Sequence, residues 1–160
     1  MFVMWWSVFG MIIAALVVYV IGHHLWLRFR QISYQKQLDQ QIRQVLPNLQ
    51  AKIPQLIPES LTSSIPVSIW HRDVLIYEYM VQLRNTSSVT ITAPALGIEL
   101  NRAPALKARL IVTECWQRGD RFHFDVAYLI NPETLEYVGD MAKIAEVDEA
   151  QAKEINNHKE

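Results

Sequence analysis

Residues 1–31, MFVMWWSVFGMIIAALVVYVIGHHLWLRFRQ, decide how this chain is organised. The first charged side chain is Arg28, so residues 1–27 form one uninterrupted uncharged run. About 20 mostly apolar residues are enough to cross the hydrocarbon layer of a membrane as a helix. Aromatic rings, which favour the lipid headgroup level, flank the run at Trp5, Trp6, His23, His24 and Trp26. The sequence therefore predicts a transmembrane helix over residues 1–27.

A cleaved signal peptide and a buried helix of a soluble core are the two alternatives. A signal peptide carries basic residues ahead of a shorter apolar centre, and none precede this run. A helix that is apolar on all sides over about six turns needs a core around it, and the rest of a 160-residue chain is too short to supply one. The membrane span is the favoured interpretation.

The basic residues near this run indicate its orientation. Arg28, Arg30, Lys36 and Arg43 follow the run, whereas no Lys or Arg precedes it. The positive-inside rule then predicts a single-pass protein of the cell membrane with its soluble domain in the cytoplasm. An extracytoplasmic or periplasmic domain is the alternative, because short amino-terminal anchors in bacteria often export the domain that follows them.

Composition excludes several function classes. Fifteen Lys and Arg against sixteen Asp and Glu give a formal net charge of -1, which argues against nucleic-acid binding. The single cysteine, Cys115, excludes an intrachain disulfide framework and a multi-cysteine zinc site.

Residues 28–46 predict an amphipathic helical stalk that continues from the membrane helix. Its apolar stripe recurs at helical spacing at Leu38, Ile42, Val45, Leu46 and Leu49. The spacing also suits a coiled-coil seam for a homo-oligomer, but the pattern lapses upstream at Gln31 and Gln35. Packing on the protein's own domain or on the membrane surface is therefore favoured. Residues 47–64 contain Pro47, Pro54 and Pro58 and predict a packed connector.

Residues 65–145 predict a small α+β domain that begins with an antiparallel hairpin. Apolar residues alternate over 65–69 and again over 75–83, and His71-Arg72-Asp73 supplies the turn between them. A polar loop or short edge strand follows, and then Thr92 with Pro94 predicts a helix start. Ala108, Ile111, Val112 and Cys115 favour a second helical piece, although residues 110–116 could also extend as a strand.

A second hairpin is predicted at the end of this domain. Residues 121–130, RFHFDVAYLI, alternate cleanly and predict a strand with one buried face. Turn residues at 131–134 and a shorter strand within 135–141 complete the hairpin. The predicted fold is thus a transmembrane helix and stalk followed by an antiparallel sheet of two hairpins packed on a helix. Residues 146–160 form a polar tail, expected to be a fraying terminal helix.

Catalytic signatures are absent, since the chain has no Gly-rich phosphate loop, no G-x-S-x-G and no H-E-x-x-H. Two pairs, His71 with Asp73 and His123 with Asp125, have the residue types for acid–base chemistry or metal ligation. A solvated strand face is the favoured explanation of His123 and Asp125. No catalytic residue, cofactor site or metal site is assigned.

Three further residues are ambiguous. Cys115 is favoured as a small buried hydrophobe over a nucleophile activated by His123. Trp70 and Trp116 fit either surface anchors for a partner or core positions.

The sequence favours a membrane-anchored, non-catalytic protein whose α+β domain binds a protein partner or assembles into a membrane or envelope complex. A membrane-tethered enzyme using His123, Asp125 and Cys115 is the first alternative. A ligand or lipid sensor that uses the aromatic-rich sheet is the second.

Orientation can be tested with reporter fusions placed after Arg43 and after Glu160. We expect the fusions that fluoresce only in the cytoplasm to be bright and those active only outside it to be silent, because the basic residues follow the span. Activity of the outside reporters would contradict the cytoplasmic assignment.

Overall fold

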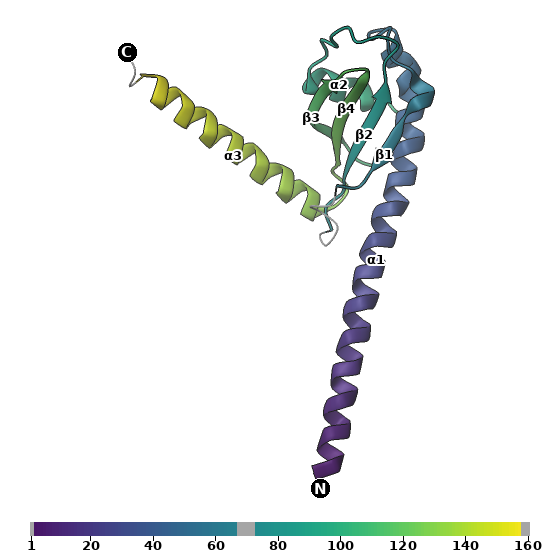
Figure 1. Cartoon of the computed structure of the whole chain (residues 1–160), viewed down its shortest axis with the longest axis vertical. Coiled ribbons are helices and arrows are strands. Elements are labelled where there is room, and N and C mark those ends of the chain that lie inside the picture. Colours follow the sequence, from purple (N-terminus) through teal and green to yellow (C-terminus); the bar gives the residue numbers. More distant parts are fainter. Residues whose placement is uncertain (1, 67–72, 158–160) are drawn as a thin grey trace.

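The structure is a computed structural model that describes residues 2–66 and 73–157. Within these residues the chain is α+β, with three α-helices, one 3₁₀ turn and a four-stranded antiparallel sheet (Figure 1). The elements are α1 (Phe2–Gln50), η1 (Pro58–Ser60), β1 (Thr62–Ser64), β2 (Ile76–Gln82), α2 (Ala93–Leu100), β3 (Leu110–Arg118), β4 (Arg121–Tyr128) and α3 (Pro132–Asn157).

Helix α1 is one continuous rod whose two halves have different surroundings. Its amino-terminal half projects away from the domain, and the carboxyl-terminal half lies along the sheet (Figure 1). Every described side chain before Leu27 is exposed, whereas Leu27 itself is only 6% exposed. By length and composition the exposed half qualifies as a membrane-spanning candidate. The domain thus contacts α1 from the residue that ends the uncharged run.

The apolar stripe of α1 supplies one wall of the main hydrophobic core. Leu38, Ile42, Leu46 and Leu49 are almost fully buried and belong to the same cluster as the inward side chains of the sheet. The stripe therefore packs on the protein's own domain, as the sequence favoured. The helix also runs through Pro47 to Gln50, further than the predicted start of the connector. Proline lacks the N–H that would bond to the preceding turn, but the residues after it can stay helical for the rest of the last turn.

A row of polar side chains on α1 lies beside this stripe and hydrogen-bonds to residues 61–63 of the same chain. The Gln35 amide donates to Ser63 Oγ (2.8 Å), and that hydroxyl donates to Asp39 Oδ2 (2.9 Å). One turn further along, Arg43 donates to the carbonyl oxygen of Leu61 (2.9 Å). The lapse in the coiled-coil pattern at Gln35 thus has a physical reason, since this position hydrogen-bonds to the edge of the sheet.

The sheet has the strand order β1-β2-β4-β3. Its inner face packs on α1 and α2, and at its centre the rings of Tyr79 and Phe124 stack 5.4 Å apart. The predicted strands over 75–83 and 121–130 are confirmed by β2 and β4. The predicted helix start is confirmed as well, because Thr92 caps α2 by accepting from the backbone N–H of Ala95 (3.4 Å).

The partner strand of β2 lies earlier in the chain than predicted. Strand β1 pairs Thr62 with Met80 and Ser64 with Glu78, whereas the predicted strand was 65–69. Residues 67–69 of the predicted strand and His71 and Arg72 of the predicted turn lie outside the described residues, as does Trp70.

The favoured prediction of a helical piece through Ala108, Ile111, Val112 and Cys115 was wrong, and the alternative of a strand over residues 110–116 is confirmed by β3. A β-bulge explains the misleading pattern: the register shifts between Val112 and Glu114, so Thr113 is an extra residue. Val112 and Cys115 therefore both face inward although they are three residues apart, which resembles helical spacing. Gly119, with φ of +63°, then allows the tight turn into β4.

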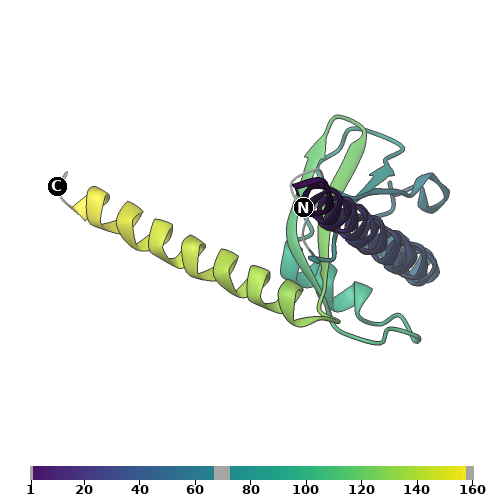
Figure 2. The ribbon, with the colours of Figure 1, turned by 90° about the horizontal axis from the view of Figure 1, so that it is seen from below.

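The prediction of a returning strand over 135–141 was also wrong, since these residues belong to α3. Asn131 caps this helix by accepting from the backbone N–H of Thr134 (3.3 Å), and Pro132 occupies the first helical position. The same residues had indicated a turn. Helix α3 leaves the domain on the side away from α1 (Figures 1 and 2).

The α1 stripe can be tested with Leu46→Ala. We expect a loss of about 2–5 kcal/mol in the free energy of unfolding, because the substitution removes buried methyl groups from the main core. Thermal unfolding of the full chain in detergent measures this loss. Gln44→Ala, an exposed position on the same helix, should change stability little. Equal effects of both variants would contradict the packing described.

Candidate functional site: the outer face of the sheet

The outer face of the sheet, which points away from α1, brings together acidic and aromatic side chains from three strands. Glu78 of β2 and Glu114 of β3 both lie opposite Asp125 of β4, so three carboxylates form one row across the sheet. In the next row, His123 lies between Met80 and Trp116. This arrangement follows from antiparallel register, in which directly opposed residues share a face.

The aromatic part of this face is a stacked pair. The rings of Trp116 and His123 lie 5.2 Å apart with an interplanar angle of 7°, and Trp116 is 39% exposed. The Nδ1 atom of His123 lies 3.4 Å from Glu78 Oε1, so the histidine pairs across strands with Glu78. The predicted pair of His123 and Asp125 does share a face, but Glu78 is the carboxylate recorded as the partner of this ring.

Asp125 is the electrostatic centre of the carboxylate row. Its pKa is raised to about 6, mainly by burial and in addition by the neighbouring carboxylates Glu78 and Glu114. Its Oδ1 atom is buried and has no hydrogen-bond partner among the described residues. A carboxylate in this position gains from an added cation or hydrogen-bond donor, because a buried unpaired acceptor costs free energy.

The arrangement of charge on this face is uneven. At the turn end of the hairpin, Arg118 lies opposite Arg121, and both are exposed. The carboxylate row lies further along the strands, beyond the pair of Trp116 and His123. The outer face therefore offers an acidic strip bordered by an exposed indole ring.

Cys115 lies on the opposite side of the sheet. It faces the core, and its Sγ donates to the carbonyl oxygen of Ile91 over 3.7 Å. Burial raises the pKa of this thiol, which disfavours the thiolate. Because neighbouring residues of a strand point to opposite faces, the sheet separates Cys115 from His123. The structure does not bring together the pair on which a cysteine nucleophile would depend.

The remaining histidine candidate of α1 and the possibility of a metal site can be assessed from the structure. His23 lies on the exposed half of α1, with ring contacts to Tyr19 at 6.1 Å and Trp26 at 6.3 Å. Within residues 2–66 and 73–157, no group of three or more His, Cys, Asp or Glu side chains is arranged to hold a metal ion.

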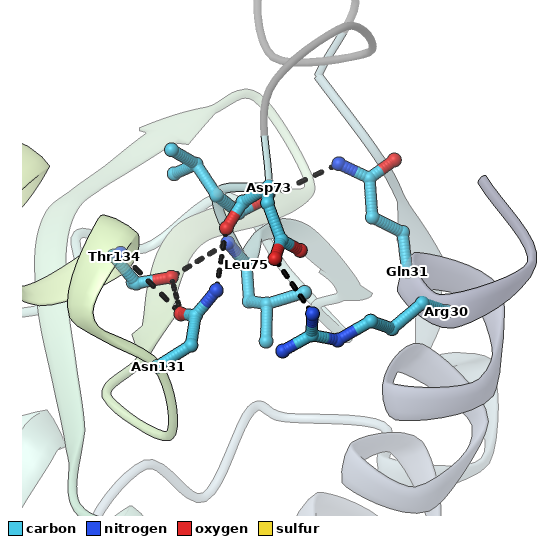
Figure 3. Close-up of polar contacts among 7 residues, drawn as sticks. Arg30, Gln31, Asp73, Leu75, Asn131 and Thr134 are labelled. Carbon is cyan, nitrogen blue, oxygen red and sulfur yellow. Dashed lines mark hydrogen bonds and ion pairs between the residues drawn. The ribbon is translucent and has the colours of Figure 1, made fainter. Parts of the chain in front are cut away.

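A second polar cluster, which the sequence analysis did not predict, joins α1, the segment before β2 and the start of α3 (Figure 3). Arg30 of α1 forms an ion pair with Asp73 (2.7 Å), and the amide of Gln31 donates to the carbonyl oxygen of Val74 (3.3 Å). From the other side, Asn131 donates to the carbonyl oxygen of Asp73 (2.6 Å).

The start of α3 completes this junction. The backbone N–H of Leu75 donates to Thr134 Oγ1 (2.9 Å), and that hydroxyl donates to Asn131. Burial raises the pKa of Asp73, and the guanidinium of Arg30 opposes this rise. The junction fixes the positions of α1, β2 and α3 relative to one another. Arg30 and Asp73 are 43 residues apart, so no local sequence pattern indicates that they pair.

Compared with models of known protein families, with curated proteins and with solved structures, the chain shows no match. The interpretation of the outer face therefore depends on its own geometry.

The raised pKa of Asp125 predicts a stability change for Asp125→Asn. An unfolded aspartate titrates near pH 4, so the wild type loses stability as the pH rises from about 4 through about 6. The variant should match the wild type near pH 4 and exceed it by about 1 kcal/mol near pH 8, a value reduced because the side chain is partly exposed.

Denaturant unfolding of both proteins across this pH range measures the difference. Asp120→Asn, an exposed carboxylate in the β3–β4 turn, serves as the control and should show no comparable pH-dependent gain. A variant less stable than the wild type at pH 8 would contradict the account of Asp125.

Proposed function

We propose that this chain is a single-pass membrane-anchored, non-catalytic binding protein whose outer sheet face docks a cationic segment of a protein partner. The proposal has two parts. The first concerns the anchor, and the second concerns the acidic strip formed by Glu78, Asp125 and Glu114.

The exposed half of α1 supports the anchor. Residues 8–26 are all exposed and contain no Asp, Glu, Lys or Arg. At 1.5 Å per residue they span about 28 Å, close to the thickness of the hydrocarbon layer. An apolar surface of this extent is stable only when lipid or protein covers it. The basic residues after the run favour a cytoplasmic domain.

The carboxylate row beside Trp116 is the observation that carries the docking proposal. Three carboxylates share one strip, and the central one has a buried oxygen with no partner among the described residues. A lysine or arginine from a partner would supply the missing positive charge. The exposed face of Trp116 adds a surface for cation–π contact, and tryptophan is enriched among residues that dominate binding energy.

Catalysis has less support on this face. His123 and Asp125 supply acid–base groups, but Cys115 lies behind the sheet and Trp116 and Met80 flank the histidine. The exposed Trp116 ring and the neighbouring Met80 are residue types that are enriched in protein-binding surfaces, so binding has more support than catalysis here.

Docking can be tested by placing a photo-crosslinking amino acid at position 118, an exposed site beside Trp116 on the outer face, in the full chain expressed in its membrane. We expect one dominant covalent adduct with another protein. Glu114→Lys in the same chain should reduce the adduct about tenfold, since it reverses an exposed charge of the strip. The same crosslinker at Thr90, in an exposed loop, is the matched control.

An adduct at position 118 that Glu114→Lys leaves unchanged would contradict docking through the acidic strip. Absence of any adduct at position 118, with the protein present in the membrane at its normal level, would contradict it as well.

A further inference from the structure

A cavity of about 350 Å³ lies between α1 and the end of β1. The described residues that line it are Arg28, Gln31, Ile32 and Gln35 from α1, with Ser64 and Ile65 from the chain at β1. One wall of the cavity is therefore the stretch of α1 that directly follows the uncharged run.

The level of this cavity along α1 matches the surface of the proposed bilayer. Trp26 is 56% exposed and Phe29 is 80% exposed, and the guanidinium of Arg30 lies 5.5 Å from the centre of the Trp26 ring. Exposed aromatic and basic side chains in this order are typical of the headgroup level. From Arg28 to Gln35 the helix rises about 10 Å. The headgroup layer of one leaflet is roughly 5–8 Å thick, so the cavity spans its depth.

The lining has the chemistry that binds a phosphate group. Arg28 presents a planar guanidinium that can donate to two oxygens of one phosphate, and none of the described lining residues is acidic. The amides of Gln31 and Gln35 add further polar groups. Both are held in place, Gln31 by its bond to the carbonyl oxygen of Val74 and Gln35 by its bond to Ser63.

The apolar part of the lining suits the glycerol ester region that adjoins the phosphate in a phospholipid. Ile32 and Ile65 border the cavity beside the polar groups, so a ligand with a phosphate and an adjoining apolar glycerol ester would meet both surfaces. A small soluble phosphate would use only the polar part.

We propose that this cavity binds the phosphate-bearing headgroup of an anionic phospholipid from the leaflet in which α1 ends. This inference rests on the proposed membrane anchor and is independent of the acidic strip on the outer face. Bound lipid would hold the domain against the membrane surface at a second point beside α1.

The test uses the full chain in nanodiscs that contain equal amounts of phosphatidylglycerol and phosphatidylcholine, followed by native mass spectrometry of the released protein. We expect the wild type to retain phosphatidylglycerol in preference to phosphatidylcholine. Arg28→Gln should reduce this retention at least about fivefold. Lys36→Gln is the matched control, because it removes the same charge from an exposed position on the same helix outside the cavity.

Glycerol 3-phosphate added in millimolar excess distinguishes the source of the phosphate. It should leave retention unchanged if the apolar part of the lipid contributes, and full displacement would overturn the assignment to a lipid. Equal retention by wild type and Arg28→Gln, or no preference in the wild type, would also overturn it. Alkaline extraction of the same membranes tests the anchor separately, so a protein that stays in the membrane without retaining lipid refutes this inference alone.

Discussion

The continuity of α1 is the constraint on which the rest of the structure depends. One helix carries an exposed uncharged surface in its first half and the main wall of the domain core in its second half. A helix cannot bend freely between its halves, because each backbone hydrogen bond joins successive turns. The sheet that packs on residues 38–49 therefore has a defined position relative to the exposed half. If that half crosses a membrane, the domain is held at the surface without a flexible tether.

This constraint gives each face of the domain a separate role. The inner face of the sheet is occupied by α1 and α2, whereas the part of the outer face around Glu114 and Trp116 is exposed and open to a partner. The junction of Arg30 with Asp73 joins α1 to the segment before β2, and Asn131 extends the same junction to the start of α3. The proposed lipid site lies at this end of the domain, whereas the acidic strip lies on the sheet surface. The two proposals thus concern different surfaces of the same domain.

The parts of the fold that sequence could predict have strong local patterns. Residues 121–130 alternate without interruption, and Thr92 with Pro94 is a local capping signal, so β4 and α2 followed directly from the sequence. The misassigned elements have local patterns that fit two structures. The bulge at Thr113 placed Val112 and Cys115 on one face at a spacing of three, and Asn131-Pro132 serves equally as a turn or as a helix cap.

The candidate site depended on information that no local pattern contains. The pair of His123 and Asp125 was visible because the two residues are close in the chain, but Glu78 and Glu114 reach them only through strand pairing. The order β1-β2-β4-β3 places β4 between the strands that carry those residues. The cavity at Arg28 likewise requires the position of β1 against α1, which depends on contacts between residues far apart in the chain.

Site-directed spin labelling along α1 in lipid vesicles tests the central claim most directly. Single labels at successive positions from 8 to 49, in a Cys115→Ser background, report access to oxygen in lipid and to a polar nickel reagent in water. The account predicts high oxygen access on every side of the helix over residues 8–26. Beyond Leu27 it predicts burial that repeats about every 3.6 residues, in phase with Leu38, Ile42 and Leu49. Periodic burial already within residues 8–26, or uniform water access over residues 28–46, would contradict it.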